Sequence, residues 1–339
     1  MGFLRRNFRF LTALQLLPAL ESGEEATLVG GQAVLEGVMM RSPHAWGIAV
    51  RKTSGEVVTH SAGLDRPSEK HKWLGWPFIR GIATLGQAMT LGFRALQFSA
   101  NVALDEVQKE DEAQDGEPLP DNKKKLEFSG WLIAANVIVS IAFFIFMYKW
   151  LPLVAATQIS HLSPGLNNRF GFNLVDGVIR IVLFLFFIWA TSRMKDIHRV
   201  FEFHGAEHKT VFAFESGQPV TVEHAQTFPT FHPRCGTSFL MTLMLISIPV
   251  YMLFPPMAFW PRLGIRILML PVIVGVSYEI IRFAARRRSS LFAVMTKPGL
   301  WLQRITTQPP SNDQVLCAMR ALDEAMELEK QRGGELVLA

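Results

Sequence analysis

The chain has 339 residues, of which 49% are hydrophobic, and these include 26 Phe and 14 Met. This composition, concentrated in separate apolar runs, excludes an ordinary soluble protein and indicates membrane insertion. The net charge is only +5, and the basic residues cluster beside the apolar runs, which excludes a nucleic-acid-binding surface. Two cysteines, Cys235 and Cys317, are too few for a disulfide framework.

The N-terminal third is predicted to begin with a membrane-surface segment and a small β unit. Residues 1–27 carry arginines before a short apolar run that is broken by Gln15 and Pro18, so we expect an interfacial segment. Within residues 28–72, the segments 45–51 and 56–61 have strand-like composition on the two sides of a Thr-Ser-Gly turn at residues 53–55. This pattern predicts a β-hairpin within a cytosolic, β-rich unit.

Two further segments precede the first long apolar run. Residues 73–104 are apolar, but Arg80 and Arg94 bracket too few residues for a membrane crossing. We therefore expect an interfacial or re-entrant helix there. Residues 105–130 are first acidic and then basic, which is typical of a solvated linker with a basic flank.

Four apolar runs are predicted to cross the membrane as helices, because each approaches the length that a hydrocarbon core of about 30 Å requires. They are residues 131–151, 174–192, 237–254 and 265–283. Asp176 and Arg180 lie in the second run and Glu279 in the fourth. Such charges inside spans either pair structurally or line a transport pathway, which leaves an ion or small-molecule transporter as one alternative.

Basic residues flank these runs on one side, which predicts that residues 193–236 and 284–339 and both termini are cytosolic. The flanking residues are Lys123 to Lys125, Arg193, Lys195, Arg199 and Arg286 to Arg288. Near the C-terminus, residues 312–332 have the apolar periodicity of an amphipathic helix, with Ser311 as its N-cap. We expect that helix to dock on the cytosolic part, so that the whole forms a polytopic α-helical membrane protein with a small α+β domain.

The chemically most informative residues lie between the second and third runs. His204, Glu207 and His208 have the spacing i, i+3 and i+4, which places them on one face of a helix. This H-x-x-E-H pattern is also that of inverted zinc proteases, with two histidine ligands and a glutamate that activates water. The sequence therefore predicts His204 and His208 as metal ligands, with Glu207 as a further ligand or as the catalytic base.

A third ligand is expected from His232 or Cys235, whose spacing suits one ion, or else from Glu215 or Glu223. Imidazole and thiolate together favour zinc, whereas a set of histidines and carboxylates equally suits iron or manganese. In the competing interpretation, the histidines are hydrogen-bonded in a polar cap over the spans and Cys235 is buried as a small apolar side chain.

Three other residues are candidates for substrate or backbone contacts. Glu36 and Arg41 lie in a glycine-rich segment whose backbone is expected to approach a ligand, the metal site or simply a turn. Arg234 adjoins Cys235 and favours its thiolate, so that a Cys/His hydrolase with His232 as base is a further alternative.

Four blocks together resemble the YqhQ-like proteins, and the resemblance extends over roughly residues 28–327. The blocks are GGQAVLEGVMMRSP (30–43), HGAEHKT (204–210), HPRCGTSF (232–239) and PGLWLQRITT (298–307). This family is a bacterial and plastid-lineage domain of unknown function, described as a predicted integral-membrane, metal-dependent enzyme. The resemblance implies a plasma-membrane or thylakoid-membrane protein.

These observations lead to one main functional hypothesis and, besides the transporter described above, one further alternative from another class. The main hypothesis is a metal-dependent hydrolase at the cytosolic membrane face, with zinc as the expected metal and an amphiphile or peptide as substrate. The alternative is a non-enzymatic factor for membrane-protein biogenesis or assembly with a structural metal site. The bilayer is the expected partner, nucleic acid is not, and the sequence leaves the oligomeric state open.

Overall fold

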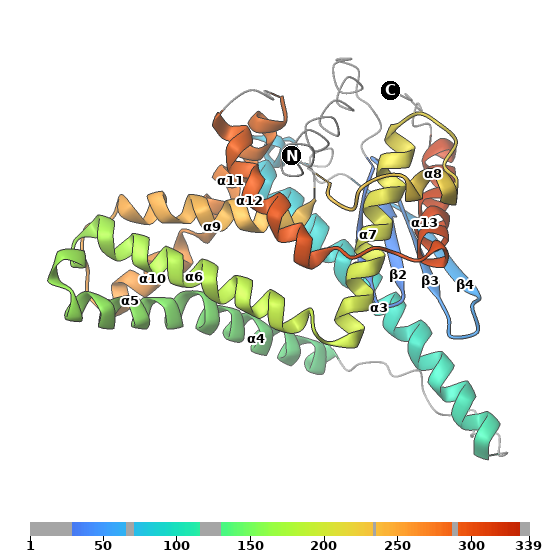
Figure 1. Ribbon diagram of the computed structural model, residues 1–339, viewed down its shortest axis with the longest axis horizontal. Helices are drawn as coiled ribbons and strands as arrows, with labels where there is room; N and C mark the ends of the chain where they lie inside the picture. Colours follow the sequence, from blue (N-terminus) through green and yellow to red (C-terminus); the bar gives the residue numbers. More distant parts are fainter. Residues whose placement is uncertain (1–28, 66–70, 116–129, 233–234, 287–290, 333–339) are drawn as a thin grey trace, which may run out of the picture.

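The structure is a computed structural model, and it describes residues 29–65, 71–115, 130–232, 235–286 and 291–332. The predicted interfacial segment, residues 1–27, lies outside the described residues. The described part is mostly helical and includes one four-stranded antiparallel sheet. A bundle of helices extends to one side of this sheet (Figure 1).

The sheet is a meander in which each strand pairs with the next along the chain. Its strands are β1 (Gly30–Val34), β2 (Gly37–Arg41), β3 (Ala45–Arg51) and β4 (Val57–Gly63). The predicted hairpin is confirmed, since β3 pairs with β4 across a turn in which Gly55 has a φ of +87°. The glycine-rich segment, for which the sequence indicated only close backbone approach, forms the hairpin of β1 and β2.

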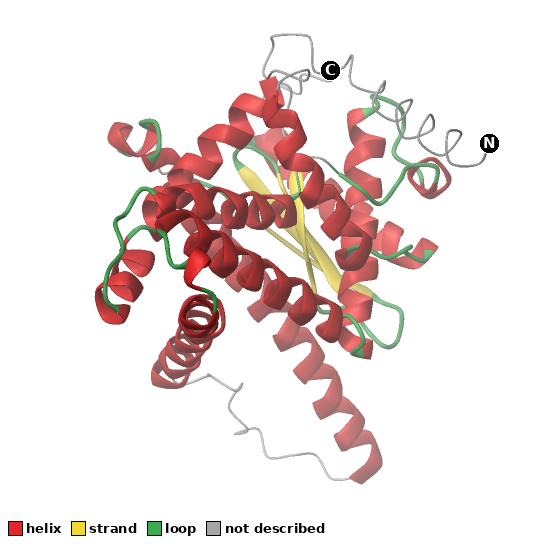
Figure 2. Cartoon of the chain, turned by 60° about the vertical axis from the view of Figure 1, so that its left-hand side comes forward, coloured by secondary structure: helices red, strands yellow, loops and turns green. Residues whose placement is uncertain are grey.

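Helices cover both faces of the sheet (Figure 2). Because side chains alternate along a strand, Val38 and Met40 face α7 (Lys195–Glu215) and α13 (Asn312–Gln331). Met39 and its neighbours face the other way, onto α3 (Ile79–Asp115). The core of this part therefore has two apolar layers with the sheet between them.

The predicted C-terminal helix is confirmed with its cap. Ser311 accepts a hydrogen bond from the backbone of Gln314, and the Gln314 side chain accepts one from the backbone of Ser311. This reciprocal arrangement is the capping box that starts α13. The helix then packs against β2, β3 and β4, as expected for docking on the β unit.

The remaining helices form the bundle and its connections. α4 (Gly130–Ile145), a π-helical segment η4 (Phe146–Trp150) and α5 (Leu151–Leu162) follow one another without a break. They are followed by η5 (Pro164–Leu166), α6 (Arg169–Thr191), α9 (Gly236–Met252), α10 (Phe259–Leu268), α11 (Leu270–Arg286) and α12 (Leu291–Thr306). The short α8 (Val222–Gln226) packs instead on α7 and α13 beside the sheet. The short η3 (Lys72–Gly75) precedes α3.

Among the residues that the structure describes, two helices are long and apolar enough to cross a membrane, namely Ala135–Leu162 and Arg169–Thr191. A third candidate is the pair Phe259–Leu268 and Leu270–Phe283, if these helices, which meet at a 45° bend, form one span. α9 is apolar but has only 17 residues. By length and composition, the described part of the chain therefore has two to three candidate spans, whereas the sequence predicted about four.

Three segments differ from the sequence-based expectation. Part of the connection expected after residue 151 is helical, since α5 continues the helix of α4 and the π-helical η4 through Pro152 as far as Leu162. The acidic segment expected to be a linker is helical as far as Asp115, since its Glu, Gln, Lys and Ala residues favour helix. Residues 291–306, expected only as part of a cytosolic segment, form α12, which packs on α9 because Leu302 is buried against Met241.

Candidate metal centre

α7 carries the H-x-x-E-H residues and joins the helical bundle to the sheet (Figure 1). The helix confirms that His204, Glu207 and His208 share one face, with the two imidazole centroids 4.5 Å apart. This face turns inward, since His208 is 2% and Glu207 is 7% exposed. Helical spacing alone thus brings two imidazoles and one carboxylate to a buried position.

Cys235 reaches the same position from the start of α9. It is the N-cap residue of that helix and has an extended backbone, with φ −68° and ψ 140°. Its Sγ lies 3.2 Å from His204 Nε2 and 3.2 Å from the Thr237 hydroxyl. One ligand atom each from His204, His208 and Cys235 lie within 4.8 Å of one another. We call these three residues the candidate centre.

Two backbone carbonyls determine which nitrogen each histidine presents. His204 Nδ1 lies 2.7 Å from the Thr306 carbonyl oxygen, and His208 Nδ1 lies 2.5 Å from that of Thr230. A carbonyl oxygen only accepts hydrogen bonds, so both Nδ1 atoms carry the proton and donate. Neutral imidazoles held in this way offer the Nε2 lone pair, which is the usual arrangement for histidines that bind a metal.

Glu207 is held beside the centre by the first hairpin of the sheet. Its Oε2 lies 3.9 Å from His204 Nε2. A Cβ on Gly31 would lie 2.8 Å from Glu207 Cγ and 2.6 Å from the Met39 carbonyl oxygen, so only glycine fits here. Burial lowers the pKa of Arg41, and the negative charge of Glu207 opposes that shift. The predicted close approach of the glycine-rich segment is therefore an approach to Glu207.

His232, a predicted third ligand, lies next to the candidate centre and outside it. Its ring centroid is 5.5 Å from that of His208 and 4.5 Å from that of Phe212. The side-chain amide of Gln303 forms two hydrogen bonds with the His232 backbone. Its oxygen accepts from the His232 N–H, and its nitrogen donates to the His232 carbonyl. Burial lowers the pKa of His232 to about 4, with Glu207 opposing and His204 reinforcing the shift. The imidazole is consequently neutral at neutral pH, and its Nε2 lies 3.6 Å from Glu215 Oε2.

The other predicted contact residues have different positions. Glu36 lies at the β1–β2 turn with a φ of 53° and forms a two-pronged ion pair with Arg199. This pair raises the pKa of Arg199 and connects the hairpin to α7. Arg41 is placed near Glu207, as described above, whereas Arg234 lies outside the described residues. Glu223 is in α8 and is not one of the three residues of the candidate centre.

Sequence reasoning did not assign roles to several residues that shape the centre, namely Thr230, Gln303 and Thr306. Thr230 and Thr306 act through main-chain carbonyls, which any residue type can supply. Gln303 is 0% exposed and also donates to the Ser238 hydroxyl. The only sequence signal was that Gln303 and Thr306 belong to the block at residues 298–307.

Comparison with known proteins places the chain in a family. Residues 76–328 match the model of a family described as "Protein of unknown function (DUF1385)". The chain belongs to this family. It is also 32% identical over 303 residues to the "Uncharacterized protein YqhQ" of Bacillus subtilis strain 168, which covers 88% of this chain and 92% of that protein. No solved structure matches the chain.

The family match includes the whole candidate centre and α13 as far as Leu328, but it begins after the four strands of the sheet. The resemblance to YqhQ-like proteins inferred from the four sequence blocks is thereby confirmed. Because the family description assigns no activity, functional inference depends on the geometry of the site.

Proposed function

We propose that this protein is an integral membrane protein whose bundle crosses the bilayer about four times. Support comes from apolar side chains that face outward on the two long helices. Ile138 and Val139 are 66% and 67% exposed, and Val182 and Phe186 are 57% and 61% exposed. Surfaces of this kind are rare in water-soluble monomers and suit contact with lipid.

The four crossings would be Ala135–Leu162, α6, α9 and the bent pair α10 and α11. α9 packs against α6, α11 and α12. Its 17 residues would span about 26 Å, which is near the lower limit for a crossing helix. With basic flanks inside, the sheet, α7, α13 and both termini would be cytosolic, and the candidate centre would lie at the cytosolic face of a plasma or thylakoid membrane.

We further propose that His204, His208 and Cys235 bind one divalent metal ion. The observation that carries this proposal is the convergence of their ligand atoms while both Nδ1 atoms are committed to carbonyls. Zinc bonds of about 2.0–2.3 Å would place the ligand atoms roughly 3.3–3.8 Å apart, so only a small contraction is needed. Two imidazoles and a thiolate favour zinc over iron or manganese.

The function that this arrangement supports best is hydrolysis at the membrane face. Three protein ligands leave a fourth position open, as in catalytic zinc sites. A bound divalent ion would supply Lewis acidity. Glu207 would accept a proton from the attacking water, since its carboxylate lies beside His204. An amphiphile or a peptide is the expected substrate class.

A structural zinc clamp in an assembly factor is the second candidate, and burial favours it. His208 and Glu207 are nearly inaccessible, and the candidate centre joins α7 to the start of α9. Closed zinc sites that connect distant segments stabilise folds without catalysis. The two candidates differ in what Glu207 does, because a clamp does not need a proton acceptor.

The test compares metal content in detergent-purified wild type and in the His204→Ala/His208→Ala double variant by elemental mass spectrometry. We expect near-stoichiometric zinc in the wild type and its loss in the double variant. His198→Ala is the matched control, since His198 is also on α7 but its side chain is 48% exposed and contacts Glu202. This control should retain the zinc. Equal trace metal in all three samples would refute the metal site.

Glu207→Gln separates the two candidates once metal is established. The variant keeps size and burial but cannot accept a proton, so an enzyme should retain zinc and lose at least about 100-fold in turnover. Turnover is measured with a panel of lipid esters and peptides in nanodiscs. A structural clamp is indicated if no substrate reacts in the wild type and metal loss instead lowers the melting temperature.

A further inference from the structure

A second group of buried charged residues lies in the helical bundle, away from α7, the helix that carries both histidines of the candidate centre. Asp176 and Arg180 on α6 are 0% and 3% exposed, Arg266 on α10 is 1% exposed, and Lys149 in η4 is 7% exposed. Asp176 forms ion pairs with both arginines. Among these four described side chains, three are basic and one is acidic, which leaves an excess of two formal positive charges.

Neutral groups satisfy only part of this positive charge. Lys149 donates to the Tyr251 hydroxyl at 2.9 Å, and Arg266 donates from Nη2 to the Asn173 side chain at 2.8 Å. Arg180 donates from Nη1 to the Ser247 hydroxyl at 2.5 Å. The Nε atoms of Arg180 and Arg266 are buried and have no hydrogen-bond partner among the described residues. Buried cations without an equal number of anions are costly in any low-dielectric interior, so the arrangement calls for a further anion.

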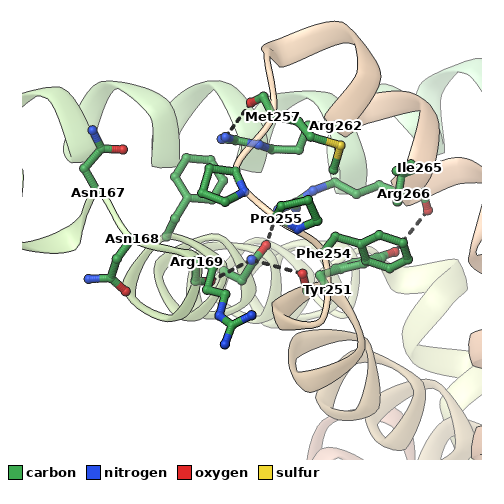
Figure 3. Close-up of a pocket in the computed structure, with 13 residues that line it drawn as sticks. Asn167, Asn168, Arg169, Tyr251, Phe254, Pro255, Met257, Arg262, Ile265 and Arg266 are labelled. Atoms are coloured by element: carbon green, nitrogen blue, oxygen red, sulfur yellow. Dashed lines mark hydrogen bonds between the residues drawn. The ribbon is translucent and has the colours of Figure 1, made fainter.

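A small cavity adjoins this positive cluster at the end of the bundle where α5 connects to α6 and α9 connects to α10. Its volume is about 30 Å³, and Arg266 forms part of its wall. Asn167, Asn168 and Arg169 line one side of it, and Arg262 and Arg266 line the other (Figure 3). The lining therefore combines three arginines with amide groups and contains no acidic residue.

We propose that this cavity and its mouth bind a phosphate-bearing anion. About 30 Å³ holds one water-sized group, so one phosphate oxygen would enter beside Arg266 while the rest of the group remains at the mouth. Arg262 is half-buried there, donates to the Met257 carbonyl and lies over the Phe172 ring, which leaves other N–H groups for the ligand. Arginine binds phosphate in two-pronged fashion, and the ligand's negative charge would offset the excess positive charge.

The phosphate could belong to a lipid headgroup or to a free anion, and one experiment distinguishes these sources. The melting temperature of delipidated, full-length protein in detergent is measured in the presence of phosphatidylglycerol, inorganic phosphate or a phosphate-free glycolipid. We expect phosphatidylglycerol to raise the melting temperature and the glycolipid to leave it unchanged. A rise with inorganic phosphate as well would identify the phosphate group itself as sufficient, and a rise with the lipid alone would identify the headgroup of a bilayer lipid.

Arg262→Gln should weaken binding at least about tenfold, because it removes a charge-assisted contact. The matched control is Arg320→Gln, since Arg320 is an exposed arginine on α13. If Arg262→Gln misfolds, Arg169→Gln replaces it, because Arg169 lines the same cavity and is exposed. Native mass spectrometry counts the phospholipid retained by each variant. The proposal is overturned if neither phosphatidylglycerol nor inorganic phosphate raises the melting temperature. It is also overturned if the cavity variants, like Arg320→Gln, retain as much phospholipid as the wild type.

Discussion

Gly31 shows how a single residue links the sheet to the candidate centre. It lies on β1, where the Glu207 side chain of α7 passes so closely that no Cβ can be accommodated. A Cβ at the same position would also lie only 2.6 Å from the Met39 carbonyl oxygen. A substitution here therefore changes the position of Glu207 without removing any atom of the candidate centre.

Replacing Gly31 with Ala should destabilise the fold. The added methyl group would clash with the Met39 main chain, which cannot rotate away as a side chain can, and overpacking of this kind costs about 1–3 kcal/mol. Thermal or denaturant unfolding of the purified protein measures the change. If the enzyme proposal holds, the variant should also lose turnover while it retains metal, because Glu207 is displaced and His204 is not replaced.

Gly86→Ala is the matched control for this prediction. Gly86 is inside α3, and a Cβ built there would have no neighbour within 4 Å. Alanine should stabilise this helical position by about 0.5–1 kcal/mol, because it loses less conformational entropy on folding than glycine does. Equal destabilisation by both substitutions would contradict the close approach at Gly31.

At the scale of elements, α13 is attached to the sheet through a carboxylate near its C-terminal end. Glu329 is 2% exposed and accepts hydrogen bonds from the Ser42 hydroxyl and the His44 backbone N–H, at 2.6 and 2.8 Å. Its Oε1 lies 2.7 Å from Nδ1 of the His44 ring. Burial alone would raise the pKa of Glu329, but these hydrogen bonds and the His44 charge outweigh it and hold the pKa below its ordinary value of 4.5.

Because the pKa is lower in the folded state, the ionised Glu329 stabilises the protein fully above about pH 4.5. This stabilisation is lost as the pH falls through the lower, folded-state pKa. Glu329→Gln should therefore be less stable than the wild type at pH 7, and the difference should shrink below pH 4.5. Melting temperatures of both proteins between pH 3 and 8 measure it, with Glu327→Gln on the exposed face of α13 as control. A pH-independent difference would contradict the prediction.

The whole molecule combines a helical bundle with a sheet that is covered on both faces, and α7 lies between them. This arrangement places the candidate centre at the junction and the arginine-lined cavity at the far end of α5, α6 and α9. If the bundle crosses a membrane, the two sites face opposite sides of it. A labelling experiment on the intact cell tests this topology directly.

A cysteine in place of Gly165, between α5 and α6, should react from outside the cell with a membrane-impermeant maleimide. A cysteine in place of Ser54, in the exposed β3–β4 turn, should react only after permeabilisation. Both substitutions are introduced into a chain that also carries Cys235→Ser, so that the free thiol of Cys235 is not labelled. Cys317 can remain, because burial raises the pKa of its thiol to about 12 and the thiolate is the reactive form. Equal labelling of the two positions in intact cells would refute the proposed topology.

The sequence by itself determined the features that depend on local physical rules. The H-x-x-E-H spacing placed three side chains on one face of α7, the Thr-Ser-Gly turn predicted the β3–β4 hairpin, and the Ser311 cap predicted the start of α13. Each of these depends on backbone preferences or side-chain periodicity over fewer than about 20 residues. The extension of α3 and the continuation of the first apolar run into α5 were missed, because an acidic segment and a proline are typical of connections, yet both are also compatible with helix.

Only the tertiary structure decided which residues come together across the chain. It brought Cys235 to His204, placed His232 beside the candidate centre, brought Gly31 against Glu207 and surrounded Asp176 with basic side chains from other helices. These positions follow from how α7, α9, α12 and the sheet pack on one another. Packing depends on the fit of whole surfaces that are far apart in sequence, so spacing along the chain does not encode these contacts in a form that local rules can read.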